Sequence, residues 1–566
     1  MRLLSKSQQP LLFYRKEAFM KKCVKRLISL LAAAVIPLSA AAVPAEAKWH
    51  ERGYLGDLNN DGMVNTADLV LMTKFMLGRS PLTTENLYAS NDKYMLVSGE
   101  ENYFTPESGY LDTADMNRDG RVDVYDLIYM KKALVNREAP QVWEWDWEFI
   151  SPPANDVLKF LPSQGEASMV VFYVDFPDCK HKYSPSDEEI EKAMFGEADD
   201  SNANYPFESV HAYYQRASKG QLDLKGKAFH YTAKNNKSYY ESDGQDKSKL
   251  LRECYSALDK SVDFSQFDSD SDGYIDATLI TVPNEAGDDY WWPCAGPSPY
   301  FSNPWVKFDG KRLGHLIVGN RELNISDDYK EFTRSYIHES GHCMGLPDYY
   351  LYNKDNVSGF DAEGLHGIAG MEMMDTDTDS DLSAVSKLQL GWYREDQVMV
   401  YDSSKGTQSF KLKDAQTDSG NCLLIPCGTL DGRLHSEYFL VEFATFHNNN
   451  SDMLNRWWIN KTNSTGIRVY HVEASLYNNG FYTIYKYESG SQFTDNNNGK
   501  RFIRILRDDQ ATYSDSNFFM IGNVIDSSVS GFKWYADDGS LSVDTGLKIE
   551  IGTLIDGEYT VTVSAA

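Results

Sequence analysis

The chain contains a short stretch with the residue types and spacing of a hydrolytic metal site, His338-Glu339-Ser340-Gly341-His342. On a helix, side chains four positions apart project from the same face, so His338 and His342 can direct a ring nitrogen at one ion. Glu339 lies beside them, where it can take a proton from a water bound to that ion. Two imidazoles and a carboxylate base are what a zinc hydrolase needs. We therefore predict zinc ligands at His338 and His342 and a catalytic base at Glu339.

A zinc site of this kind needs a third protein ligand, and the residues after the motif can supply one. Gly345 permits a sharp turn, because glycine adopts positive φ at little cost. Pro347 cannot continue a helix, so the chain can fold back towards the two histidines at Asp348. We predict Asp348 as the third zinc ligand, which leaves a fourth position for water. Glu363 or Glu372 would take its place if the loop folded differently.

Residues 48–137 contain an internal repeat in which an Asp/Asn/Gly loop precedes an amphipathic helix. Each copy has oxygen ligands at positions 1, 3, 5, 9 and 12 of a calcium loop, glycine at position 6 and a backbone carbonyl at position 7. Position 12 is aspartate in both copies, whereas an EF-hand has glutamate there. The predicted calcium ligands are Asp57, Asn59, Asp61, Met63, Asn65 and Asp68 in the first copy, and Asp115, Asn117, Asp119, Arg121, Asp123 and Asp126 in the second.

A third acidic cluster lies in the middle of the chain, over residues 268–276. Carboxylates and a backbone carbonyl at this spacing can wrap a calcium ion with a structural role. The candidate ligands are Asp268, Asp270, Asp272, Tyr274 (by its carbonyl) and Asp276. A plain Asx turn is the alternative, because no acidic residue follows at position 12.

The surrounding pattern predicts a multidomain α+β protein. Six consecutive apolar residues predict a buried strand over 167–176. Beyond residue 400, short alternating strands separated by Gly, Asn and Asp are typical of a β-sandwich. The expected helices are near 186–194, 207–216 and 249–258, and further strands are expected over 222–231 and 277–282. The expected domains are a signal peptide at 1–47, a small all-α calcium-binding module at 48–137, a linker at 138–156, a catalytic domain at 157–399 and a C-terminal β-rich accessory domain at 400–566.

The first 47 residues have the layout of a secretory signal peptide. Basic residues at 21–26 precede an apolar run at 27–42 and an A-x-A site at 45–47, and Met20 is a plausible true start. No later segment is apolar for long enough to cross a bilayer. The six cysteines beyond the signal peptide either form disulfides, with Cys422 and Cys427 the closest pair, or remain free. The expected location is therefore extracellular.

The net charge of −28 comes largely from carboxylates in Asp/Asn/Gly loops. This clustering indicates cation binding rather than a disordered acidic tail. A nucleic acid partner is not expected, because phosphate binding needs clustered Lys and Arg.

The calcium repeat resembles a dockerin, the module that docks enzymes onto the cohesin domains of a cell-surface or cellulosomal scaffold. The match lies over 55–78 and 113–135, with a longer gap between the copies than is usual. The resemblance implies calcium binding and a cohesin partner on a scaffoldin. The recognition positions differ between the copies, Thr66-Ala67 against Val124-Tyr125, so a single binding orientation is expected.

The region over roughly residues 165–565 resembles the immune inhibitor A family of secreted zinc metallopeptidases. The stretches that carry the likeness are 173–178, 209–224, 268–276, 338–348, 382–392, 438–442 and 466–472, and the family pattern HExxHxxGxxD is complete. The resemblance implies a metzincin-like α/β catalytic domain and a peptide or protein substrate. It also implies a methionine turn beneath the zinc, for which Met374 fits best and Met373 is the alternative.

Together these features predict a secreted zinc endopeptidase that is tethered to a scaffold through a calcium-dependent dockerin. Two other functions stay open. The chain could be an inactive binding or structural component, although His338, Glu339 and His342 are all intact. It could also be a zinc hydrolase of a non-peptide substrate, such as an ester or a glycan amide.

Overall fold

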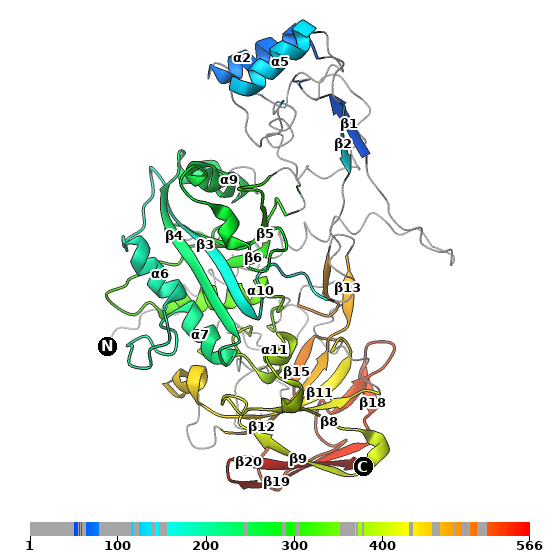
Figure 1. The fold of residues 1–566 in the computed structure, drawn as a ribbon. Helices are drawn as coiled ribbons and strands as arrows, with labels where there is room; N and C mark the ends of the chain where they lie inside the picture. Colours follow the sequence, from blue (N-terminus) through cyan, green and yellow to red (C-terminus); the bar gives the residue numbers. More distant parts are fainter. Residues whose placement is uncertain are drawn as a thin grey trace, which may run out of the picture.

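The computed structural model describes most of the chain from residue 156 onward and parts of the N-terminal region (Figure 1). The described residues are 50–54, 56, 58, 64–77, 116, 124–136, 142–146, 156–241, 247–285, 290–301, 303, 306–350, 368, 372–375, 379–428, 434–455, 465–479, 482–489, 493, 499–506 and 518–566. The expected signal peptide at 1–47 lies outside them.

A five-stranded mixed sheet forms the centre of the middle region, in the order β4-β3-β5-β7-β6. The strands are β3 (Gly165–Asp175), β4 (Leu222–Thr232), β5 (Tyr274–Thr281), β6 (Cys294–Pro297) and β7 (Arg312–Gly319). The first four strands in this order pair in parallel, and β6 runs antiparallel to β7 at the edge. β3 and β5 are buried along almost their whole length, which explains the continuous apolar run 169–174 of β3.

Helices cover both faces of this sheet. They are α6 (Asp187–Phe195), α7 (Val210–Ala217), α8 (Lys237–Glu241), α9 (Lys247–Leu258) and α10 (Lys330–Cys343), with the 3₁₀ helix η2 (Phe264–Phe267). Apolar side chains of α6, α7 and α10 pack with Val171 and Leu279 on one face. Those of α9 pack with Val170 and Ile280 on the other. The middle region is therefore a layered α/β unit (Figure 1).

The ends of α6 and α7 depend on serine caps. A capping box begins α6: Glu189 N donates to Ser186 Oγ over 3.2 Å, and Ser186 N donates to Glu189 Oε2 over 2.8 Å. The helix expected over 207–216 begins later, at Val210, because Ser209 accepts a hydrogen bond from Ala212 N and acts as the N-cap.

The C-terminal region consists of two sheets that pack face to face, the arrangement of a β-sandwich. One has the order β15-β12-β11-β10-β8 and the other β16-β19-β20-β9. The first contains β8 (Val398–Val400), β10 (Cys422–Pro426), β11 (Glu437–Ala444), β12 (Gly466–Glu473) and β15 (Ile503–Ile505). The second contains β9 (Gln408–Lys413), β16 (Val524–Ile525), β19 (Leu547–Ile555) and β20 (Glu558–Ala565). Two hairpins are formed by β13 (Leu476–Asn478) with β14 (Thr483–Tyr485) and by β17 (Lys533–Tyr535) with β18 (Leu541–Asp544).

The middle and C-terminal regions share one apolar core. Side chains alternate along β11, so that Phe439 and Val441 face the second sheet while Tyr438 and Leu440 belong to the core that contains α10. The helix α11 (Ala384–Gln389) packs against β11 from that side. Residues on both sides of position 400 are therefore held together by continuous burial of apolar surface. The remaining short elements are the 3₁₀ helices η3 (Glu395–Gln397), η4 (Ser403–Lys405) and η5 (Asn448–Asn455).

The N-terminal region has two helices that pack side by side, α2 (Thr66–Met76) and α5 (Val124–Asn136) (Figure 1). Leu58, Met72 and Met130 are buried between them. The strands β1 (His50–Tyr54) and β2 (Val142–Asp146) pair antiparallel, one on each side of the repeat in the sequence. The two calcium-loop copies thus form one small unit.

All six cysteines beyond residue 47 are free thiols, so the alternative of unpaired cysteines is the one observed. Within the described ranges, none of the helices is long and apolar enough to span a lipid bilayer.

Candidate metal centre

The two histidines of the motif lie on the last turns of α10, four residues apart. Their rings lie edge to face, with centroids 4.9 Å apart and an angle of 85° between the ring planes. His338 Nδ1 lies 2.9 Å from the carbonyl oxygen of Met373, and His342 Nδ1 lies 2.8 Å from that of Leu346. A carbonyl oxygen only accepts, so each Nδ1 carries the hydrogen and donates it. A neutral ring with this tautomer has its lone pair on Nε2, as a metal ligand requires.

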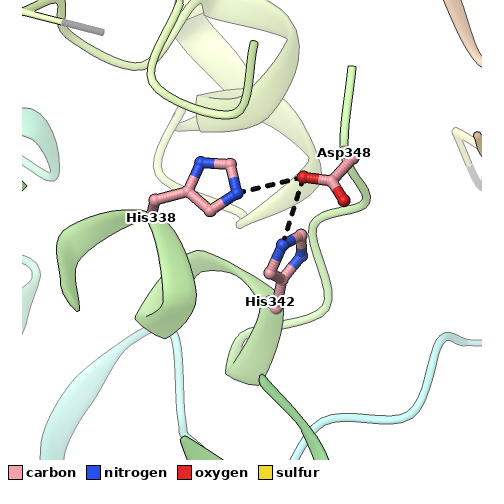
Figure 2. Close-up of side chains that lie close together, drawn as sticks. All are labelled: His338, His342 and Asp348. Atoms are coloured by element: carbon pink, nitrogen blue, oxygen red, sulfur yellow. Dashed lines mark hydrogen bonds and ion pairs between the residues drawn. The ribbon is translucent and has the colours of Figure 1, made fainter. Parts of the chain in front are cut away.

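Both Nε2 atoms point at one oxygen of Asp348 (Figure 2). The distance to Asp348 Oδ1 is 3.0 Å from His338 Nε2 and 3.3 Å from His342 Nε2. Ligand atoms about 2 Å from a tetrahedral zinc ion lie about 3.3 Å from one another. In the described part of the chain, these three residues form a group whose ligand atoms all lie within 4.8 Å of each other. The donor set and its spacing therefore fit a zinc ion with one position left open.

The turn after α10 brings Asp348 back to the histidines. Gly345 has φ +98°, and a Cβ atom there would come within 2.6 Å of Val157 Cγ2. Leu346 N donates to Gly341 O over 3.0 Å, which closes the turn. Glycine is needed at position 345 both for its backbone conformation and for the close approach of Val157.

Electrostatics keep Asp348 ionised. Burial alone would raise the pKa of its carboxyl group, but the neighbouring imidazoles of His342 and His338 hold that pKa well below its ordinary value. Burial lowers the pKa of His342, whereas Asp348 raises it and Glu339 adds to the rise. Glu339 is 6% exposed, and its negative charge contributes to the rise in the pKa of His342.

Glu372, an alternative third ligand, is engaged elsewhere. Its Oε1 accepts from Ser386 Oγ over 2.7 Å, and its Oε2 accepts from Met374 N over 3.2 Å. Burial raises the pKa of Glu372 to about 8, and the nearby charge of Asp375 contributes to the rise. The other alternative, Glu363, lies outside the described residues.

The turn that contains Glu372 packs against α10 and contacts His338. Met373 supplies the carbonyl oxygen for His338 Nδ1, and Tyr349 N donates to Met374 O over 2.9 Å. The side chain of Met374 lies against Gly341 of α10. The sulfur of Met374 thus packs against the helix that carries the motif.

The acidic loop at 268–276 has features of both a cation site and an Asx turn. Carboxylate oxygens of Asp268, Asp270 and Asp276 lie within 4.8 Å of one another. Asp268 Oδ1 is buried with no hydrogen-bond partner, although Asp268 Oδ2 pairs with Lys311 Nζ at 2.5 Å. Asp272 is not in that group; its Oδ1 accepts from Tyr274 N over 2.8 Å.

In each calcium loop of the repeat, the structure describes the second position (Leu58 or Met116) and the last residues, 64–68 or 124–126. Asp68 and Asp126, at position 12 of the two loops, are fully buried. Asp68 accepts from Leu58 N and Asn65 N, each over 2.8 Å, so its carboxylate faces the loop. The other predicted ligands of the repeat lie outside the described residues: Asp57, Asn59, Asp61, Met63, Asp115, Asn117, Asp119, Arg121 and Asp123.

Three residues near the centre were not found from the sequence. His315 of β7 is buried, and its Nδ1 accepts from Phe160 N over 3.2 Å. Burial lowers the pKa of His315 to about 3, with His342 contributing, so it is neutral. Tyr350 stacks on His338 with centroids 6.3 Å apart, and Glu488 interacts electrostatically with His342 and Asp348. Lone residues far apart in the chain carry no motif that would reveal them.

Comparisons with known proteins identify part of the chain. No curated protein matches it. Two crystal structures of OgpA from Akkermansia muciniphila are similar, with 12% and 11% sequence identity and TM-scores of 0.22 and 0.21. Each alignment covers 52% of this chain and 75% of OgpA. Residues 55–135 match the dockerin type I domain, so the chain carries a calcium-binding dockerin of the kind that attaches proteins to cohesin-bearing scaffolds.

Proposed function

We propose that this protein is a secreted zinc-dependent endopeptidase, which its dockerin tethers to an extracellular scaffold such as a cellulosome. The observation that carries the catalytic part is the convergence of His338 Nε2 and His342 Nε2 on Asp348 Oδ1, at 3.0 and 3.3 Å. The resemblance to the immune inhibitor A family supports the choice of a peptide substrate. Met374 packed against Gly341 agrees with a methionine turn beneath the centre.

The residues of the site have separate roles in this proposal. His338, His342 and Asp348 would hold the zinc ion, which when bound lowers the pKa of a water ligand to about 7 and polarises the scissile carbonyl. Glu339 accepts the proton of the attacking water and then gives it to the leaving amine. The carbonyl oxygens of Met373 and Leu346 fix the imidazole tautomers, so that Nε2 stays available.

The edge strand β6 offers a place for an extended peptide. Among the strands that the structure describes, it pairs only with β7, and it lies next to α10. An extended peptide can add to such an edge through main-chain hydrogen bonds. A peptide that pairs with β6 would lie close to α10, the helix that carries the motif.

The dockerin presents different surfaces on its two helices. On α5 the exposed side chains include Tyr125, Ile128 and Tyr129, which are 60%, 40% and 51% exposed. On α2 the recognition positions Thr66 and Ala67 are small. Large aromatic side chains commonly dominate protein interfaces, so we propose that cohesin binds mainly to α5, in a single orientation.

Zinc content and proteolysis, measured together, test the enzyme proposal. The purified chain should contain one zinc per molecule and digest casein, and Glu339→Ala should keep the zinc and lose the digestion. Glu331→Ala is the matched control, because Glu331 is an exposed glutamate on the same helix, paired with Arg321. Zinc without proteolysis would favour an inactive or non-peptide hydrolase, and absence of zinc would rule out the proposal.

A cohesin pull-down tests the attachment proposal. Binding should require calcium, because without a cation the loop carboxylates repel one another and the unit unfolds. Tyr125→Ser combined with Tyr129→Ser should weaken binding by at least about tenfold, whereas Val70→Ser on α2 should change it little. Binding that survives chelation, or that depends on Val70 instead, would contradict this.

A further inference from the structure

The third ligand of the candidate centre stands on a loop, whereas the two histidines stand on a helix. Asp348 follows the last residue of α10 by five positions, after the turn at Gly345 (Figure 2). A metal site needs each ligand held within about 0.5 Å by the contacts around it. We call residues 346–350 the ligand loop. The contacts of Tyr349 and Tyr350, the two residues after the ligand, therefore decide how firmly Asp348 is placed.

The polar groups of Tyr349 are bound within the middle region. Its hydroxyl group lies 2.7 Å from Ser386 Oγ, which itself donates to Glu372 Oε1 over 2.7 Å, so Tyr349 donates to Ser386. The backbone N–H of Tyr349 donates to Met374 O over 2.9 Å. These two hydrogen bonds connect the ligand loop to α11 and to the turn that contacts His338.

The ring of Tyr349 packs on a residue of the C-terminal region. It stacks on Phe502, with centroids 5.5 Å apart and an angle of 28° between the ring planes. Phe502 is 2% exposed and stands directly before β15. Its backbone is fixed in two directions, because Phe502 N donates to Tyr487 O over 2.8 Å and Glu473 N donates to Phe502 O over 2.9 Å. The ligand loop thus rests on a firmly held aromatic side chain from a distant part of the sequence.

The next residue, Tyr350, is also bound by the C-terminal region. The hydroxyl group of Ser489 donates a hydrogen bond to the carbonyl oxygen of Tyr350. The ring of Tyr350 stacks on His338, with centroids 6.3 Å apart. Ser489 and Phe502 belong to one connected segment, since Phe502 N is bonded to Tyr487 O. This segment therefore contacts both residues that follow the third ligand.

We infer that Phe502 and Ser489 are positioning residues of the metal centre, through which the C-terminal region holds Asp348 against the two imidazoles. Each acts on a neighbour of the ligand: Phe502 on Tyr349, and Ser489 on Tyr350. This inference rests on the zinc site of the proposed function. It gives the C-terminal region a part in metal binding, beyond that of an accessory domain.

The zinc affinity of full-length variants tests the inference. Phe502→Leu keeps an apolar side chain but removes the stacked ring, and Ser489→Ala removes a single hydroxyl group. Each change should weaken zinc binding by about tenfold, the lower end of what the loss of an outer partner costs. Competition with a chelator measures the affinity. A variant that binds zinc as tightly as the wild type would overturn the role of the residue it replaces.

Two matched variants show whether any loss of stability in this protein weakens zinc binding. Phe532→Leu truncates a fully buried phenylalanine that packs on Phe439, between the two C-terminal sheets. Ser163→Ala removes a hydroxyl group that likewise donates to a carbonyl oxygen, that of Leu390, over 3.0 Å. Both control variants should keep the zinc affinity of the wild type while their melting temperatures fall. A tenfold loss of zinc affinity in the controls as well would overturn the inference.

A double-variant cycle tests whether the effect passes through Asp348. Asp348→Asn removes the charge of the ligand, so the exact position of this side chain should matter less. When Phe502→Leu or Ser489→Ala is added to Asp348→Asn, zinc binding should weaken by no more than about twofold further, compared with about tenfold in the wild-type background. Full additivity would mean that the two residues act on the fold in general, and the positioning role would then be wrong.

The inference and the proposed function fail in different ways. If the wild-type chain binds no zinc, the proposed function fails and the positioning role fails with it. If Asp348→Asn weakens zinc binding while Phe502→Leu and Ser489→Ala leave it unchanged, only the positioning role fails.

Discussion

The sulfur of Met374 packs against Gly341, a residue that stands between His338 and His342 in the sequence of α10. A Cβ atom on Gly341 would come within 2.6 Å of that sulfur. The sequence motif leaves this position open, so the requirement for glycine comes from the packing of a turn more than thirty residues away.

Replacing Gly341 by alanine should therefore destabilise the protein. In an exposed helix this change would stabilise by roughly 1 kcal/mol, whereas overpacking here should cost about 1–3 kcal/mol. Thermal unfolding measures the loss of stability, and zinc content shows whether the altered protein still binds the metal. In the double variant Gly341→Ala with Met374→Ala, the penalties should be less than additive, because the second change removes the clash. Strict additivity would show that the two residues do not interact.

Asp348 and Glu372 should differ in their effect on zinc. Asp348→Asn removes a ligand charge and should weaken zinc binding by more than the roughly 10–100-fold that loss of an outer partner costs. Glu372→Gln should weaken zinc binding by no more than roughly 10–100-fold, since the Glu372 carboxylate accepts hydrogen bonds from Ser386 Oγ and Met374 N. Competition with a chelator measures both affinities. The reverse order would identify Glu372 as the ligand.

The acidic loop should make calcium stabilisation depend on pH. Burial raises the pKa of Asp272 to about 6 and of Asp276 to about 7, and for Asp272 the neighbouring carboxylates contribute. Both values lie above the unfolded value of 3.8, so the folded state holds more protons. Without calcium, the stability present below pH 4 is lost as the pH rises through 6 and 7.

Added calcium should therefore raise the melting temperature more at pH 8 than at pH 5. Asp270→Asn should reduce the calcium-induced rise in melting temperature for the unfolding transition of residues 156–566. The calcium-induced rise for the dockerin transition should stay unchanged. An increment independent of pH and of Asp270 would mean that the loop is an Asx turn without a cation.

The shared core should make the middle and C-terminal regions unfold together. Leu440→Ala on β11 should cost about 2–5 kcal/mol and lower a single transition, in which zinc is also released. Val543→Ala is the control, because Val543 is 45% exposed and its truncation should cost little. Two separate transitions for residues 156–399 and 400–566 would contradict a common core.

Most local secondary structure could be predicted from the sequence. The strand β3 and the helices α6 and α9 all lie within a few residues of their predicted positions. Each depends on short-range information: a buried parallel strand needs continuous apolar residues, and a cap needs a serine with a glutamate three positions on. The start of α7 was wrong by three residues, because the cap at Ser209 outweighed the apolar pattern that begins at Phe207.

Longer-range relationships were not available from the sequence. The predicted domain boundary at residue 400 follows a change from helical to alternating apolar periodicity. Periodicity alone does not show which face of β11 packs against the middle region and which against the second sheet. The environments of His315 and Glu488 are set by segments far apart in the chain, and neither belongs to a spaced motif. The position of Asp348 near the two histidines could be predicted because it depends on a local turn at Gly345.

The location of the metal tests the central claim most directly. Anomalous diffraction at the zinc edge from crystals of the zinc-loaded protein should give a peak about 2 Å from His338 Nε2, His342 Nε2 and Asp348 Oδ1. A peak elsewhere, or none at this site in fully loaded protein, would contradict the account.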